Sequence, residues 1–335
     1  MLAWRWREED VLVHALPLSH QHGLSGVHAT LLAGSAAVIL SQFTADDLLE
    51  QAAKHRATVL FAVPSVYQRL IAEPAGADRL AALDLRLAIS GSAPLSAALS
   101  TTLAATLGEP PLERYGSTES GLNVSNPFDG PRKPGAVGLA LPGVQLRVAD
   151  ESGAERDAGH EGEILVRGPQ VFGGYWNQPQ ASAAAFHPGG WFRTGDLGRI
   201  DPHDGYLTIT GRIKELIISG GLNVYPREVE QVLQLHLTVS EAAVAGLPSD
   251  RWGEEVTAWV VPATGAEVDT AELLAHCREL LSAYKCPKRI YLADELPRTS
   301  MGKLKRGALV RAAAEWPIDR TMLDHAVAAL WRVEL

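Results

Sequence analysis

Residues 113–120 (ERYGSTES) combine side chains suited to binding phosphate and a divalent metal ion. Gly116, Ser117 and Thr118 are expected to end a strand, with a helix beginning directly after them. Such a turn presents backbone N–H groups and hydroxyls to an anion. Glu119 adds one carboxylate, which suits a Mg²⁺ ion held mainly by phosphate and water oxygens. The alternative is a polar turn in which Ser117 or Thr118 only caps the helix.

Three later segments each carry one polar residue that could contact a nucleotide. They are residues 191–196 (WFRTGD), 211–221 (GRIKELIISGG) and 297–306 (PRTSMGKLKR). Asp196 follows a glycine, a pairing that is also common in ordinary turns. Arg212 could be a solvated charge at the end of a hairpin. Lys303 follows Gly302 in a basic segment, where a lysine can bring a point charge to a phosphate.

The first third of the chain alternates strand and helix patterns, which predicts how these residues are positioned. Strand patterns cover residues 11–17, 36–41, 58–64 and 86–90, and helix patterns cover 23–33, 44–56 and 96–107. This alternation predicts a doubly wound parallel sheet with helices on both faces. Ligands bind such sheets beyond the carboxyl ends of the strands, where Pro17, Gly91 and Gly116 fall.

The pattern changes twice along the chain, which predicts an α/β protein of several parts. We expect a partial doubly wound sheet in residues 1–130, a β-rich subdomain in 131–213, a small α+β domain in 214–312 and an amphipathic tail in 313–335. Glycine and proline become frequent in the second part, where short β patterns replace helices.

Composition excludes several classes of protein. The 335 residues carry a net charge of -9, which argues against a nucleic-acid partner. Only 2 cysteines are present, Cys277 and Cys286, and they predict a reducing compartment without disulfides. The charged N-terminus does not resemble a signal peptide, and no apolar stretch is long enough to span a bilayer. We therefore expect a cytoplasmic protein without a membrane partner.

The order of the motifs is more specific than any of them alone. YGSTE, then TGD, then GRIKELI, then Gly-Lys resembles the adenylate-forming superfamily of acyl-CoA synthetases, luciferases and peptide-synthetase adenylation domains. Residues 17–24 (PLSHQHGL), 90–95 (SGSAPL) and 162–179 also resemble family motifs in the expected order, so that the resemblance runs from about Leu2 to about Ala312. It implies an enzyme that joins an acid to ATP as an acyl-adenylate and then to coenzyme A.

The resemblance also implies a role for each motif residue. Nucleotide contacts are expected from Ser90, Gly91, Ser92, Tyr115, Gly116, Ser117, Asp196 and Arg212, and catalytic roles from Thr118, Glu119 with Mg²⁺, and Lys303. Lys214 stands at the family's hinge position, and rotation there would exchange Lys303 for Gly220 and Gly221, which line the tunnel for the pantetheine of CoA.

Within the family the chain most resembles malonyl-CoA synthetases. Arg114 stands where most acyl-CoA synthetases have a small or apolar residue in the acyl pocket. A guanidinium there would be costly unless it met an anion, and the free carboxylate of malonate or methylmalonate supplies one. His20 and His22 resemble the stretch that closes this pocket. The alternatives are an exposed Arg114 paired with Glu113, another short-chain or aryl acyl-CoA synthetase, or a binding protein without catalysis.

One family motif has no counterpart in the chain. The Ser/Thr/Gly-rich phosphate loop ending in Lys-Gly precedes residues 17–24 in the family, and no such string stands before His20. We therefore expect a fragment or a mis-set start codon. A degenerate gene product, or half of a split enzyme completed by a complementing N-terminal fragment, are the alternatives. The parallel sheet is then expected to leave an apolar edge and face exposed.

Overall fold

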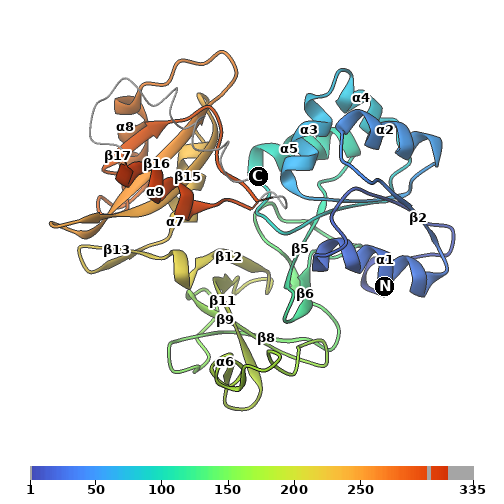
Figure 1. Ribbon diagram of the computed structural model, residues 1–335, viewed down its shortest axis with the longest axis horizontal. Helices are drawn as coiled ribbons and strands as arrows, with labels where there is room; N and C mark the ends of the chain where they lie inside the picture. The colour runs from blue at the N-terminus through green and yellow to red at the C-terminus, as the bar shows by residue number, and fades with distance from the viewer. Residues whose placement is uncertain (1, 300–302, 316–335) are drawn as a thin grey trace. The chain divides into compact units, whose positions relative to one another are not determined.

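The computed structural model describes residues 2–299 and 303–315, and the chain divides into two compact units, Met1–Ile209 and Thr210–Leu335. The first unit contains a parallel sheet and a β-rich part, and the second contains a smaller sheet with helices (Figure 1). The boundary lies within a strand, close to the expected hinge residue Lys214. The boundaries expected near residues 131 and 214 stay predictions.

A seven-stranded sheet forms the centre of the first unit. Its strands are β1 (Val11–His14), β2 (Ala36–Ile39), β3 (Val59–Ala62), β4 (Leu87–Ser90), β5 (Leu112–Ser117), β6 (Gly121–Ser125) and β7 (Leu139–Ala140), in the order β2-β1-β3-β4-β5-β6-β7. The first five are parallel, and β6 and β7 join antiparallel. Strands β3 and β4 are buried along their whole length, as expected where helices cover both faces.

Helices cover both faces of this sheet, which confirms the doubly wound architecture. They are α1 (Gln21–Ala33), α2 (Ala45–Lys54), α3 (Pro64–Ala72), α4 (Gly76–Ala81) and α5 (Ala97–Leu107), after a short 3-10 helix η1 (Leu2–Trp4). Helix α1 lies on one face and α2 to α5 on the other (Figure 1). Thr44 caps α2 by accepting from the Asp47 backbone N–H at 3.1 Å.

The outer edge of the sheet is apolar and exposed, in agreement with the sequence. Strand β2 is the edge strand, and Ile39 at its end is half-exposed. Leu31 and Leu32 on the neighbouring helix α1 are 74% and 75% exposed. Large apolar side chains at a sheet edge are unusual on the surface of a monomer.

The helix expected after the ERYGSTES motif is absent, and this prediction was wrong. Strand β5 turns directly into the antiparallel strand β6. The Ser117 hydroxyl accepts from the Ser120 backbone N–H at 3.2 Å, so it closes a turn and caps no helix. Gly116 lies so close to the backbone of Gly121 that a Cβ there would be 2.0 Å from the Gly121 carbonyl oxygen. The close pairing of the two strands therefore replaces the expected helix.

A second, β-rich layer completes the first unit. It contains β8 (Gln145–Ala149), β9 (Gly162–Arg167), β10 (Phe186–His187), β11 (Trp191–Ile200) and β12 (Leu207–Arg212), with one short helix α6 (Pro179–Ala184). The strands run in the order β10-β11-β9-β8, and β12 pairs with β11. Phe172, Phe186 and Phe192 pack against one another at its core, with ring centroids 5.4–5.7 Å apart.

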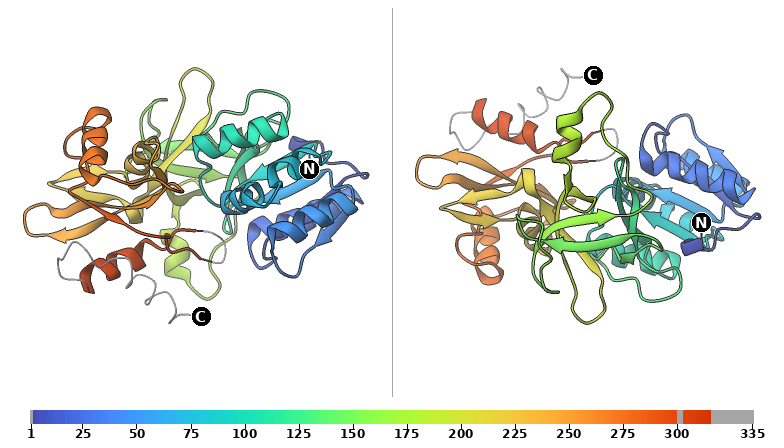
Figure 2. Two further views of the ribbon diagram at one scale, coloured as in Figure 1. Left: turned by 90° about the horizontal axis from the view of Figure 1, so that it is seen from above. Right: turned by 90° about the horizontal axis from the view of Figure 1, so that it is seen from below.

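The second unit is the predicted small α+β module. Its strands β13 (Ile217–Ser219), β14 (Leu222–Val224), β15 (Val239–Ser249), β16 (Gly253–Pro262) and β17 (Arg289–Leu292) form one sheet in the order β14-β13-β16-β15, with β17 beside β16. Its helices are η2 (Ile213–Glu215), α7 (Pro226–Gln234), α8 (Thr270–Leu280) and α9 (Arg306–Glu315). Helices α7 and α8 share one apolar core and α9 contributes to another. Helices α8 and α9 lie on opposite sides of the sheet (Figure 2). The predicted tail beyond Glu315 lies outside the described residues.

Within residues 2–299 and 303–315, no helix has both the length and the apolar character needed to cross a membrane.

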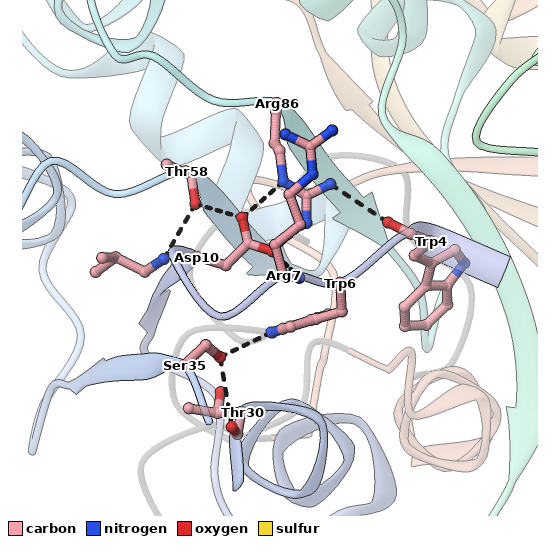
Figure 3. Close-up of polar contacts among 9 residues, drawn as sticks. Trp4, Trp6, Arg7, Asp10, Thr30, Ser35, Thr58 and Arg86 are labelled. Carbon is pink, nitrogen blue, oxygen red and sulfur yellow. Dashed lines mark hydrogen bonds and ion pairs between the residues drawn. The ribbon is translucent and has the colours of Figure 1, made fainter. Parts of the chain in front are cut away.

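A buried ion pair joins the starts of three parallel strands (Figure 3). Asp10, just before β1, is 2% exposed. Its carboxylate accepts from Arg86 Nε at 2.6 Å, from the Thr58 hydroxyl at 2.9 Å and from the Arg7 backbone N–H at 2.8 Å. Arg86 also donates to the Trp4 carbonyl at 3.3 Å. Because Thr58 precedes β3 and Arg86 precedes β4, the carboxylate fixes the N-terminal ends of β1, β3 and β4 together.

We predict that Asp10→Asn lowers the free energy of unfolding by about 3 kcal/mol, because it leaves the half-buried guanidinium of Arg86 without its counter-ion. Burial would raise the pKa of Asp10, but the bonds from Arg86, Arg7 and Thr58 hold it below its ordinary value of 3.8. The contribution is therefore complete above that value and disappears as the pH falls below it. Urea denaturation of both proteins between pH 3 and pH 7 measures this.

The exposed pair of Asp46 and Arg79 provides the matched control. Asp46→Asn should cost less than about 1 kcal/mol, since exposed ion pairs contribute little. Equal losses for the two variants, or a loss at Asp10 that does not shrink in acid, would contradict the role given to the buried pair.

Candidate functional site

The residues predicted to bind substrate come together at the carboxyl ends of the parallel strands. His22 lies in the first turn of α1 after β1, Ser90 ends β4 and Gly91 follows it, and Arg114 and Tyr115 belong to β5. All of them lie within the first unit. Parallel strands end at the same edge of a sheet, which is why these separate motifs can form one site.

Arg114 is buried in this cluster among aromatic rings. Its side chain is 7% exposed, and its Nε and Nη2 have no hydrogen-bond partner among the described residues. The guanidinium carbon lies 5.8 Å from the ring centroid of Phe61 and 6.0 Å from that of Trp4. Burial lowers the pKa of Arg114 to about 9. The alternative of an exposed arginine at a strand end is therefore wrong.

His22 is the second buried polar residue of the cluster. It is 4% exposed, and its ring packs against Phe61 at 5.6 Å. Nδ1 lies 3.1 Å from the Ser92 hydroxyl, whereas Nε2 has no partner in the part of the chain that the structure describes. Burial, and secondly the charge of Arg114, hold the pKa of His22 well below 6.5. The imidazole is therefore neutral. His20, just before α1, is exposed and remains outside the cluster.

Gly91 explains how these two side chains can approach each other. A Cβ at this position would lie 3.2 Å from His22 Cε1 and 3.4 Å from Arg114 Cγ. Any larger residue would therefore displace one of them. Ser90, which precedes it, is buried, and its hydroxyl has no hydrogen-bond partner within the described ranges.

His14, at the end of β1, belongs to the same cluster and was not predicted. It is fully buried, with its ring 6.4 Å from Phe61. Neither ring nitrogen has a hydrogen-bond partner of normal geometry among residues 2–299 and 303–315. Burial lowers the pKa of His14 to about 4, with the Gly23 backbone acting in the opposite direction. A histidine inside an otherwise apolar strand pattern was the signal in the sequence.

Tyr115 links the parallel sheet to the β-rich layer. Its hydroxyl donates to Asp196 Oδ2 at 2.8 Å, and both side chains are buried. Asp196 lies in β11, and its position is also fixed by its backbone N–H, which donates to the Thr194 hydroxyl at 3.1 Å. Two residues that the sequence assigned to nucleotide binding are thus brought into contact.

Thr118 and Glu119 lie in the turn between β5 and β6. The Tyr175 hydroxyl donates to Glu119 Oε1 at 3.3 Å, and the Phe172 backbone N–H donates to the Glu119 carbonyl at 2.8 Å. In the described part of the chain, no three His, Cys, Asp or Glu side chains are grouped to hold a metal ion. A single carboxylate fits a Mg²⁺ ion that takes its other ligands from phosphate and water.

The remaining predicted residues belong to the second unit. Arg212, Lys214 and Lys303 are exposed, and the Lys303 backbone N–H donates to the Thr299 hydroxyl at 3.2 Å. Gly220 and Gly221 form the tip of the hairpin between β13 and β14, with φ of +60° and +78°. Both angles favour glycine. Gly302, which precedes Lys303 in the predicted loop, lies outside the described residues.

Comparison with known proteins identifies close relatives. Residues 1–176 match the family described as AMP-binding enzyme, and residues 228–303 match the AMP-binding enzyme C-terminal domain. An oxalate--CoA ligase of Arabidopsis thaliana is 38% identical over 94% of this chain and 62% of its own length. A mitochondrial malonate--CoA ligase of Bos taurus, ACSF3, is 36% identical over 92% of this chain and 58% of its own length.

A solved structure has the same fold. ATP-bound MatB from Rhodopseudomonas palustris superposes with a TM-score of 0.87 and 45% identity, over 92% of this chain and 61% of that protein. The chain thus spans about three fifths of the length of these relatives. Because the family description matches more than half of the chain, the protein belongs to the AMP-binding enzyme family.

Proposed function

We propose that the protein is an acyl-CoA synthetase that activates malonate, or a closely related short dicarboxylate such as methylmalonate, with ATP and coenzyme A. The observation that carries the proposal is the buried guanidinium of Arg114, with two nitrogen atoms lacking a partner in the described residues. A buried cation of this kind is destabilising unless a ligand supplies an anion. A dicarboxylate retains one carboxylate after the other has been activated.

We infer the roles of the other residues from the two half-reactions. The reacting carboxylate attacks the α-phosphorus of ATP, forming acyl-AMP and releasing pyrophosphate, and the CoA thiol then attacks the acyl carbon and releases AMP. We infer that Tyr115, Gly91 and Asp196 hold adenine and ribose, with Arg212 assisting. Thr118, Ser117 and the backbone at Gly116 contact phosphate, and Ser90 lines the site. A bound Mg²⁺ at Glu119 would neutralise phosphate charge.

The alternative is a different acid. The relatives include an indoleacetate--CoA ligase of Aromatoleum aromaticum, 39% identical over 89% of this chain, besides the oxalate and malonate ligases. An aryl acid leaves the Arg114 guanidinium without an anion, which favours the dicarboxylates. Oxalate differs from malonate only in length, so the panel of acids in the test must contain both.

The 335-residue chain by itself is expected to give no detectable malonate-dependent AMP release, because ATP lacks its phosphate loop. The proposal is therefore tested with the chain extended upstream by that loop, with ATP and Mg²⁺, against malonate, methylmalonate, oxalate, propionate and indoleacetate. Pyrophosphate release reports the first half-reaction, and thioester formation after adding CoA reports the second. Calorimetric binding of each acid gives a second readout. We expect the short dicarboxylates to bind and react best. A preference for propionate or indoleacetate would contradict the proposal.

In the extended version of the enzyme, Arg114→Leu should weaken the use of malonate by about 2–4 kcal/mol, which is about 30- to 700-fold in kcat/KM, because the free carboxylate loses its charged partner. Propionate should be used as well as before, or better. Arg69→Leu is the control, since Arg69 lies 5.8 Å from the ring of Phe43, outside the cluster. A malonate preference that survives in Arg114→Leu would show that another residue selects the acid.

In the extended version of the enzyme, Lys303→Ala should abolish formation of the acyl-adenylate, while thioester formation from supplied malonyl-AMP and CoA continues. We propose that Lys303 contacts the reacting carboxylate and the α-phosphate and leaves before CoA enters, by rotation at Lys214 that brings Gly220 and Gly221 to the CoA tunnel. Lys305→Ala, two residues along, should change neither step. Equal loss of both half-reactions in Lys303→Ala would contradict this division of roles.

A further inference from the structure

Ser92 combines a strained backbone with a contact to the buried imidazole of His22. Its φ is +68°, in the left-handed region that is costly for a residue with a Cβ. Its hydroxyl lies 3.1 Å from His22 Nδ1. Strained residues persist where the surrounding structure holds them, often at functional sites. Glycine would relieve the strain at this position, but glycine has no hydroxyl.

The contact allows His22 two neutral forms. If Nδ1 carries the proton, it donates to the Ser92 hydroxyl, and Nε2 presents a lone pair. If the Ser92 hydroxyl donates to Nδ1, the proton resides on Nε2. The serine hydroxyl accommodates both forms, because it can donate or accept. When the hydroxyl donates to Nδ1, however, only the form with the proton on Nε2 is possible.

Only the second form suits an anion beside Arg114. Nε2 of His22 is buried and has no hydrogen-bond partner in the described residues, and the same holds for Nε and Nη2 of Arg114. His22 Cε1 and Arg114 Cγ lie 3.2 Å and 3.4 Å from the position that a Cβ on Gly91 would occupy. The imidazole and the guanidinium also both lie against the ring of Phe61, at 5.6 Å and 5.8 Å. A carboxylate in this region would be repelled by a lone pair on Nε2 and bound by an N–H.

We propose that Ser92 is a positioning residue whose hydroxyl donates to His22 Nδ1 and so keeps the proton on Nε2, where His22 donates beside Arg114 to the substrate's free carboxylate. This inference rests on the proposed function and deepens it. It gives Ser92 a role in selecting the acid, in place of the nucleotide contact that the sequence implies. It also gives the unfavourable φ a reason, because the backbone carries the hydroxyl to the imidazole.

The test combines the state of the imidazole with the affinity for the acid, using the 335-residue chain. Chemical shifts of the two ring nitrogens, in protein labelled with ¹⁵N-histidine, report which one carries the proton, and His22→Gln identifies the signals. In the presence of malonate we expect the proton on Nε2. Ser92→Ala and Ser92→Gly should each weaken malonate binding about fivefold, with ATP binding unchanged, because Nδ1 loses the donor that fixes the ring.

Two comparisons separate positioning from folding. Ser92→Gly removes the hydroxyl and relieves the strained φ, so a role in backbone conformation alone predicts unchanged malonate affinity in this variant. Ser96→Ala removes the cap of α5, where the hydroxyl accepts from the Leu99 backbone N–H at 3.2 Å, and controls for general destabilisation. It should leave the His22 signals unchanged.

The outcomes distinguish this inference from the proposed function. A proton on Nδ1 with malonate bound, or malonate affinity that is unchanged in both Ser92 variants, overturns the role of Ser92 while the proposed function stands. Failure of the unaltered chain to bind any dicarboxylate overturns the proposed function and this inference with it.

Discussion

The site depends on one constraint, the burial of the Arg114 guanidinium against aromatic rings without a counter-ion in the described residues. Phe61 is central to it, because Trp4, Trp6 and His22 all pack against the same ring. Cation–π contacts of this kind contribute about 0.5–2 kcal/mol, less than the several kcal/mol needed to desolvate the charge. The packing of the parallel sheet must therefore stabilise an arrangement that is locally unfavourable, which is the usual situation of a site prepared for a ligand.

A second arginine in the same sheet shows the contrast. Arg86 lies before β4, at the opposite edge, and its charge is neutralised by the buried carboxylate of Asp10. Arg114 lies in the neighbouring strand β5, close to the carboxyl edge. Polar groups are thus paired where the strands begin, whereas His14, Ser90 and Arg114 retain unpaired atoms, within the described ranges, where they end. The difference between the two edges locates the site independently of any motif.

Much of this arrangement could be predicted from the sequence, and the predictions that failed did so for local reasons. The β-α alternation predicted the parallel sheet. The positions of the motifs within it indicated that Gly91, Arg114 and Tyr115 lie near its carboxyl edge. The hairpin after β5 was missed because a serine at the end of a strand can cap a helix or close a turn, and only the pairing of Gly116 with β6 decides between them. His14 and the contact between Ser92 and His22 were missed because their partners are distant in the chain. The roles of Arg212, Lys214, Gly220, Gly221 and Lys303 stay predictions.

Selectivity in such a site arises from exclusion as much as from attraction. An acid with only one carboxylate must use it for activation, and it then leaves Arg114 buried beside an apolar group, a cost of about 1–3 kcal/mol or more. Close packing adds a second restriction. A Cβ built on Gly91 would already lie within 3.4 Å of His22 and Arg114, so that a branch on the proposed substrate would displace one of these side chains if it entered this space. Under the proposed function, charge would exclude simple monocarboxylates, whereas the space beside Gly91 would limit where a substituted dicarboxylate can carry its branch.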